Sequence, residues 1–132
     1  MIRNGKASII GKQPNPFHWL AADDFARMIS TAYKKSEALN KVFYILGPEP
    51  FLMKKLLKRY CSENFAGIKK VSSIPLGMIK IIAMLSRNKQ LKFAAEMFAY
   101  FEKVKEVCDT KETNLLLGKP EITFDNWLLN KK

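Results

Sequence analysis

The chain has 132 residues, of which 48% are hydrophobic. This composition is enough for one apolar core, but the chain is too short for two ordinary domains. Its formal net charge of +11 would attract phosphates, nucleic acid or an anionic membrane surface, without naming one of them. The basic residues are scattered, with no block of five in a row. We interpret them first as a solvated surface and keep a polyanion-binding site as the alternative.

Cysteine usage and segment lengths favour an intracellular protein. Cys61 and Cys108 fall in different predicted helices and form no CxxC pair, as expected for free thiols in a reducing compartment. The first residues show no signal-peptide pattern. The longest apolar stretch, residues 74–85, contains Lys80 and is well short of the ~20 residues that a membrane span needs. We expect a soluble cytoplasmic protein with no membrane partner.

The first half of the chain predicts two helices separated by a strand. Asp23 and Asp24 precede apolar residues at helical spacing and are expected to cap a helix that ends at Lys34-Lys35. Residues 41–46 are β-branched and aromatic and predict a strand that stops at the Gly-Pro-Glu-Pro turn of residues 47–50. A second amphipathic helix is expected over residues 50–63, with its lysines on the solvated face.

The second half predicts a short strand and further helices. Residues 69–74 are a candidate strand ended by Pro75, and residues 78–85 and 89–106 predict two helices with a break at Arg87-Asn88. The second of these two helices is apolar on more than one side, which indicates a central helix or an interface. A short amphipathic piece follows at residues 124–129, with Thr123 placed to cap it. The whole chain therefore predicts a mainly helical α+β fold, with a small sheet of short strands, in one domain over residues 1–132.

Motifs for cofactor-dependent redox chemistry are missing from the sequence. Its six glycines are too far apart for a GxGxxG fingerprint or a P-loop. None of the four tyrosines is followed four residues later by the lysine of the usual proton-transfer pair in short-chain dehydrogenases. We therefore expect no bound cofactor and no catalytic set in this chain alone.

Two single residues offer weaker chemical alternatives. His18 is the only histidine, so a multi-histidine metal site is excluded, and its neighbours Trp19 and Asp23 could hold its ring in one tautomer for acid-base work. We favour a histidine packed against the start of a helix. Cys61 stands near Lys58 and Arg59, which could lower its pKa, but core packing is the favoured interpretation. An enzyme using His18 or Cys61 on a small substrate stays open as the weakest hypothesis.

Several segments, in this order, resemble the C-terminal half of atypical and extended short-chain dehydrogenases, the NmrA-like and nucleoside-diphosphate-sugar epimerase group. They are Phe17-His18-Trp19-Leu20, Asp23-Asp24-Phe25-Ala26-Arg27-Met28, the strand and turn Lys41–Glu49, Lys55-Leu56-Leu57, Leu117–Pro120 and Thr123–Leu128. The resemblance implies that residues 17–20 lie where the substrate half meets the cofactor sheet, and that helices over residues 75–106 cover the substrate side. In the family, NAD or NADP is bound by the half that precedes Phe17, which is missing here.

The combined expectation is a non-catalytic, truncated substrate-side or interaction domain without metal or cofactor of its own. We expect self-association or a Rossmann-type partner, with nucleic-acid binding as the less favoured alternative. The candidate substrate-side or interface residues are His18, Trp19, Met78, Phe93, Met97 and Tyr100.

Overall fold

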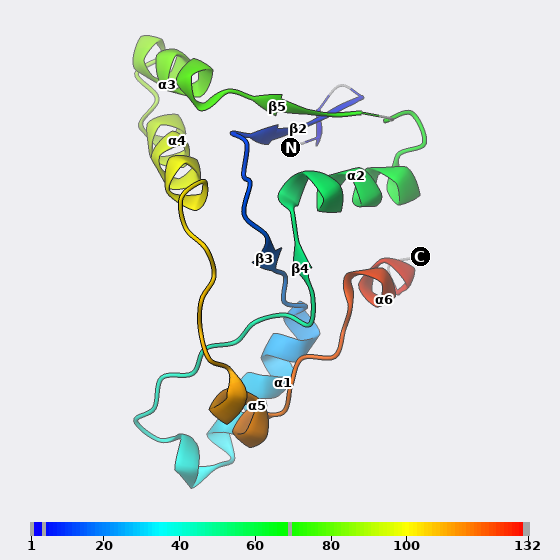
Figure 1. The fold of residues 1–132 in the computed structure, drawn as a ribbon, viewed down its shortest axis with the longest axis vertical. Helices are drawn as coiled ribbons and strands as arrows, with labels where there is room; N and C mark the ends of the chain where they lie inside the picture. The colour runs from blue at the N-terminus through cyan, green and yellow to red at the C-terminus, as the bar shows by residue number, and fades with distance from the viewer. Residues whose placement is uncertain (1, 4, 69, 131–132) are drawn as a thin grey trace. The chain divides into compact units, whose positions relative to one another are not determined.

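The computed structural model describes residues 2–3, 5–68 and 70–130, and these form an α+β fold of helices and short strands (Figure 1). Backbone contacts divide the chain into two compact units. Unit 1 consists of residues 1–17 and 51–105, and unit 2 consists of residues 18–50 and 106–132. The single domain expected from the chain length is thus resolved into two units, each assembled from two separate stretches of chain.

Unit 1 contains a three-stranded sheet in the order β1-β2-β5. Strand β1 (Ile2–Arg3) is antiparallel to β2 (Lys6–Ile10), and β2 is parallel to β5 (Val71–Ile74), with Ala7 opposite Val71 and Ile10 opposite Ile74. Parallel neighbours need a long crossover between them. Here the crossover includes helix α2 (Met53–Asn64), which runs beside β2 and β5 (Figure 1).

Helix α2 covers one face of this sheet and closes the core of unit 1. Ala7 and Ile9 from β2 and Val71 from β5 are buried together with Cys61 from α2. Alternate residues of β2 point to the same face, which explains why Ala7 and Ile9 are buried while Lys6 is exposed. The expected strand over residues 69–74 is confirmed for Val71–Ile74, whereas position 69 lies outside the described residues.

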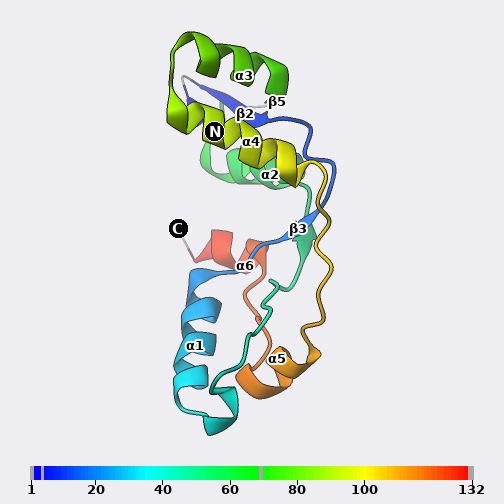
Figure 2. The ribbon, with the colours of Figure 1, turned by 90° about the vertical axis from the view of Figure 1, so that its left-hand side faces the viewer.

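Helices α3 (Leu76–Leu85) and α4 (Lys89–Phe101) lie side by side and are joined by a short turn (Figure 2). The expected break at Arg87-Asn88 is confirmed: Arg87 has a left-handed φ of 51°, and the Asn88 side chain caps α4 by accepting from Leu91 N at 3.0 Å. Helix α4 was expected to reach residue 106 but ends at Phe101. The Asn15 side chain donates to the carbonyl oxygens of Glu102 and Val104, and in a helix that reached residue 106 the Glu102 carbonyl would accept from the Glu106 N–H instead.

Unit 2 is built around helix α1 (Ala22–Tyr33), with a 3-10 turn, η1 (Ser36–Ala38), helix α5 (Lys111–Leu117) and helix α6 (Phe124–Leu129). Helix α1 packs against α5, and buried apolar side chains in this unit include Met28, Leu117 and Leu128. The expected cap of α6 is confirmed, since Thr123 Oγ1 accepts from Asn126 N at 3.2 Å. Strands β3 (Phe17–His18) and β4 (Pro50–Phe51) form a separate two-stranded sheet.

Three local predictions are wrong. Residues 41–46 are extended but form no strand. Val42 and Tyr44 are exposed, and no described strand pairs with this segment. Its β-branched residues therefore have no neighbouring strand to form backbone hydrogen bonds with. The cap residue of α1 is Ala21, not an aspartate, because Asp23 and Asp24 lie inside the first turn. Cys108 lies after α4 and outside any helix.

Candidate functional site

His18, in unit 2, is oriented by a carboxylate. Its ring Nδ1 lies 2.9 Å from Glu106 Oε2, and its backbone N–H donates to the same oxygen at 2.7 Å. Both side chains are about one quarter exposed. An ionised carboxylate only accepts hydrogen bonds, so Nδ1 carries the hydrogen and Nε2 of the neutral ring is an acceptor for a ligand.

This pair differs from the one considered in the sequence. Asp23 was the proposed partner, but the structure places Glu106 there, 88 residues away along the chain. Nothing local in the sequence indicates a contact over that separation, and Glu106 was expected inside a helix. Because α4 ends early, residues 102–110 are free to bring Glu106 to the histidine.

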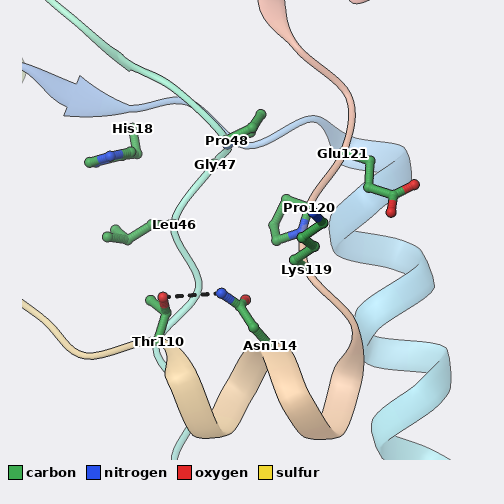
Figure 3. Close-up of a pocket in the computed structure, with 9 residues that line it drawn as sticks. All are labelled: His18, Leu46, Gly47, Pro48, Thr110, Asn114, Lys119, Pro120 and Glu121. Atoms are coloured by element: carbon green, nitrogen blue, oxygen red, sulfur yellow. Dashed lines mark hydrogen bonds between the residues drawn. The ribbon is translucent and has the colours of Figure 1, made fainter.

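His18 lines a cavity of about 530 Å³ whose walls come only from unit 2 (Figure 3). This is within the usual size range of small-molecule pockets. The apolar part of the wall is made by Leu46, Pro48 and Pro120. The remaining lining residues are His18, Gly47, Thr110, Asn114, Lys119 and Glu121.

Two polar side chains of the wall come from the start of α5. Asn114 Nδ2 donates to Thr110 Oγ1 at 3.2 Å, as drawn in Figure 3. The Thr110 hydroxyl therefore has its own hydrogen left to donate, and Asn114 Oδ1 can accept. Together with His18 Nε2, the wall offers acceptors and a donor that suit a ligand with hydroxyl groups.

The opposite wall, residues 119–121, is held by a buried aspartate. Asp24 Oδ2 accepts from the backbone N–H groups of Glu121 and Ile122 at 2.8 and 2.7 Å, and Asp24 Oδ1 accepts from Arg27 Nη2 at 2.9 Å. The Arg27 guanidinium also donates to the carbonyl oxygen of Lys119 at 2.8 Å. Burial alone raises the pKa of the Asp24 carboxyl, but the hydrogen bonds from Arg27 and the two backbone groups outweigh it and hold that pKa below its usual value.

Gly47 allows the wall segment of residues 46–48 to pack closely against the backbone of Trp19. A Cβ added at Gly47 would overlap the carbonyl oxygen of Trp19. The glycine of the predicted Gly-Pro-Glu-Pro turn is therefore required by close packing of two backbone segments. Trp19 itself is half-exposed and does not line the cavity.

The other expected site residues lie in unit 1. Phe93, Met97 and Tyr100 stand at i, i+4 and i+7 on α4, so they share one side of that helix, and Met78 lies on α3. All four are exposed, Phe93 by 68%. The structure thus divides the candidate residues into a cavity in unit 2 and an apolar surface in unit 1.

The residues missed by sequence reasoning are those that make the cavity polar. Glu106, Thr110 and Asn114 show no motif, because their only shared property is their position in the fold. The turn of residues 47–50, which contains Gly47, is predicted by the sequence, and turns next to a rigid scaffold commonly form binding sites.

Nucleophile and metal chemistry find little support among the described residues. Cys61 is completely buried, and burial raises the pKa of its thiol, so the hypothesis of a thiolate activated by Lys58 and Arg59 is wrong. No group of three His, Cys, Asp or Glu side chains in the described part of the chain could hold a metal ion. No helix there is long and apolar enough to cross a membrane.

Comparison with known proteins adds no relative: no family model, no curated protein and no solved structure matches this chain.

Proposed function

We propose that this chain is a non-catalytic substrate-side or interaction domain of the NmrA-like or epimerase type, which depends on residues outside these 132 to hold NAD or NADP. The observation that carries the proposal is the cavity of unit 2, where His18 is oriented by Glu106 beside Thr110 and Asn114. The sequence has no glycine fingerprint and no Tyr-Lys pair to supply redox chemistry.

The chemistry of the cavity favours binding over catalysis. Its lining contains no serine, cysteine or tyrosine, and its one hydroxyl, that of Thr110, accepts a hydrogen bond from Asn114 and makes none to the His18 ring among the described residues. A histidine held by a carboxylate can accept a proton, but one such pair without a nucleophile completes no catalytic set. The polar groups and the three apolar residues together suit a small molecule with hydroxyl groups and an apolar part.

The proposal is tested by calorimetric and thermal-shift titration of the purified chain with nucleotide sugars, NADH and NADPH. We expect a nucleotide sugar to bind and the isolated dinucleotides not to bind. In Glu106→Gln the carboxylate that fixes the His18 ring is lost, and we expect about tenfold weaker binding, the loss of roughly one charge-assisted hydrogen bond.

Glu112→Gln is the matched control, because Glu112 is an exposed carboxylate that pairs with Lys41 away from the cavity. It should bind like the wild type. Tight binding of NADH or NADPH by the chain alone would overturn the proposal, since it would require a complete dinucleotide site. Equal affinities of the two glutamine variants for the nucleotide sugar would show that the cavity does not bind it.

Polyanion binding by unit 1 is the second candidate function, and one observation favours it. Residues 1–17 and 51–105 contain fifteen Lys and Arg against three Asp and Glu, whereas unit 2 contains eight against nine. The charge that looks scattered in the sequence is therefore concentrated in one unit. A strong dependence of duplex DNA binding on salt would distinguish this function from the first.

A further inference from the structure

Helix α4 ends although its hydrogen-bond pattern could continue. Glu102 N donates to Phe98 O and Val104 N donates to Tyr100 O, both at 3.1 Å and both four residues back, as in an α-helix. The residues that follow form no helix before α5 (Figure 1). Glutamate and lysine, which make up most of residues 102–106, are good helix formers. The local sequence therefore does not end the helix, and the cause lies in another part of the chain.

Asn15 holds this segment in a non-helical conformation. Its Nδ2 donates to the carbonyl oxygen of Glu102 at 3.2 Å and to that of Val104 at 2.8 Å. Carbonyl groups two residues apart in an α-helix are turned by about 200° around its axis, so one side-chain amide outside the helix cannot reach both. The Lys12 N–H also donates to the Glu102 carboxylate. These bonds favour the irregular backbone over a longer α4.

The irregular backbone lets Glu106 reach His18. The ring of Phe101 packs edge-on against that of Phe17, with centroids 5.6 Å apart, so the residue before His18 is held at the end of α4. A non-helical residue advances up to about 3.3 Å, against about 1.5 Å in a helix. A helix continued through residues 104–106 would therefore draw Glu106 back by up to about 5 Å. Its carboxylate, now 2.9 Å from His18 Nδ1, would lose the ring.

We infer that Asn15 is a positioning residue for the cavity of unit 2, because it keeps α4 short and thereby keeps Glu106 on the His18 ring. Asn15 lies in unit 1 and does not line the cavity, so its effect runs along the backbone from Val104 to Glu106. The inference rests on the proposed function, since it assigns a control to the same binding site. By linkage, a ligand that needs the oriented ring opposes the longer helix.

The test compares the full chain with Asn15→Ala and Asn15→Asp, because neither a methyl group nor an ionised carboxylate can donate to the two carbonyl groups. Far-UV circular dichroism should show about one more turn of helix in both variants. Nitrogen NMR at about pH 8, where an ordinary histidine is neutral, should find the ring hydrogen of His18 on Nδ1 in the wild type and shared between both ring nitrogens in the variants.

Affinity for the nucleotide sugar is the third readout. It should fall about tenfold in Asn15→Ala, as in Glu106→Gln, because both substitutions remove the same carboxylate from the ring. Combining the two substitutions should cause no further loss, since residues that act through one contact are not additive. A further tenfold loss in the double variant would contradict a role of Asn15 through Glu106.

Lys105→Pro provides a rescue of Asn15→Ala. A proline at this position has no N–H for the helical bond to Phe101 O, so it prevents α4 from continuing. The Lys105 N–H makes no hydrogen bond within the described residues that a proline would break. Added to Asn15→Ala, it should return the helix content, the His18 tautomer and the affinity to the wild-type values. A chain that Asn15→Ala had merely unfolded would not recover in this way.

Asn64→Ala is the matched control, because Asn64 Nδ2 also donates to a backbone carbonyl, that of Tyr60 at 3.0 Å, but within α2. It should leave the His18 tautomer and the affinity unchanged. An unchanged tautomer in Asn15→Ala, an equal change in Asn64→Ala, or a tautomer that Lys105→Pro does not restore would overturn the inference. The tautomer is measured without ligand, so a wild-type chain that binds no nucleotide sugar would refute the proposed function alone.

Discussion

Asp24 is a buried charged residue of the amphipathic helix α1 in unit 2, and it binds the backbone of a loop far away in the sequence. It is 3% exposed and accepts hydrogen bonds from Arg27, Glu121 and Ile122. A buried carboxylate is tolerated only when such bonds compensate its lost hydration. It therefore supports the wall of the cavity without lining it.

We expect Asp24→Asn to lower the free energy of unfolding by about 1–3 kcal/mol at pH 7, because an amide cannot accept all the hydrogen bonds of the carboxylate. The folded-state pKa of Asp24 is depressed, so its stabilisation is present above the usual aspartate pKa of about 3.9 and is lost as the pH falls through the folded value. The difference in the free energy of unfolding between the wild type and the variant should therefore decrease at acid pH, as measured by urea denaturation at several pH values.

Asp23→Asn is the control, because Asp23 is an exposed aspartate in the same helical turn. Its stability should stay within about 0.5 kcal/mol of the wild type. An Asp24→Asn variant as stable as Asp23→Asn at pH 7 would show that the three hydrogen bonds contribute nothing net.

Single residues were the least predictable part of the candidate site. His18 and the neighbouring turn could be singled out from the sequence, since a lone histidine and a Gly-Pro pair are locally distinctive. Glu106 and Asp24 could not be assigned, because their partners lie 88 and 97 residues away. An aspartate before an apolar run has the same local pattern whether it caps its own helix or binds another segment.

At the scale of elements, helical periodicity was a better guide than strand composition. Helices α1, α2 and α3 lie close to the predicted ranges, since each has its own apolar repeat, and α4 begins at the predicted residue but ends five residues early. Strand β2 was missed, and residues 41–46 were wrongly given a strand, because a strand depends on a neighbour that local sequence does not show.

Gly77 offers a test of how much the helix propensity of its own residues limits the stability of α3. It lies in the first turn of α3 with no atom within 4 Å of an added Cβ. Alanine is a better helix former than glycine, so Gly77→Ala should raise the free energy of unfolding by about 0.5 kcal/mol. The midpoint of urea unfolding measures the change.

Gly118→Ala is the contrasting variant. Gly118 has a φ of 80°, in the left-handed region, and an added Cβ would lie 2.9 Å from Arg27 Nη1. It should destabilise the chain by about 1 kcal/mol or more. Opposite signs for the two substitutions are expected, and equal signs would contradict the assigned backbone geometry.

At the scale of the whole molecule, the distribution of charge follows the units and not the order of the chain. Unit 1 has an excess of twelve basic residues and unit 2 has an excess of one acidic residue. Twelve of the fifteen basic residues of unit 1 lie in residues 51–105, but the sequence does not show that residues 1–17 belong to the same unit. Net charge was thus predictable, and the assignment of these two stretches to one unit was not.

The segregation of charge predicts that a polyanion binds to unit 1. A duplex DNA should bind weakly and lose affinity steeply with salt. Replacing Lys54 and Lys58, both exposed on α2, by glutamine should lower the salt slope by up to about 2, roughly one for each lysine at a phosphate. Replacing Lys34 and Lys111 of unit 2 is the control and should change nothing. Equal effects of the two pairs would contradict a role for unit 1.

The interleaved order of the two units sets a sequence of events during synthesis. Asp24 leaves the ribosome early, but the backbone groups that bind it follow 97 and 98 residues later. At about 5–20 residues per second this delay is roughly 5–20 s, far longer than a helix needs to form. Until then α1 exposes both its apolar side and an aspartate without its later partners, which is the kind of surface that chaperones shield.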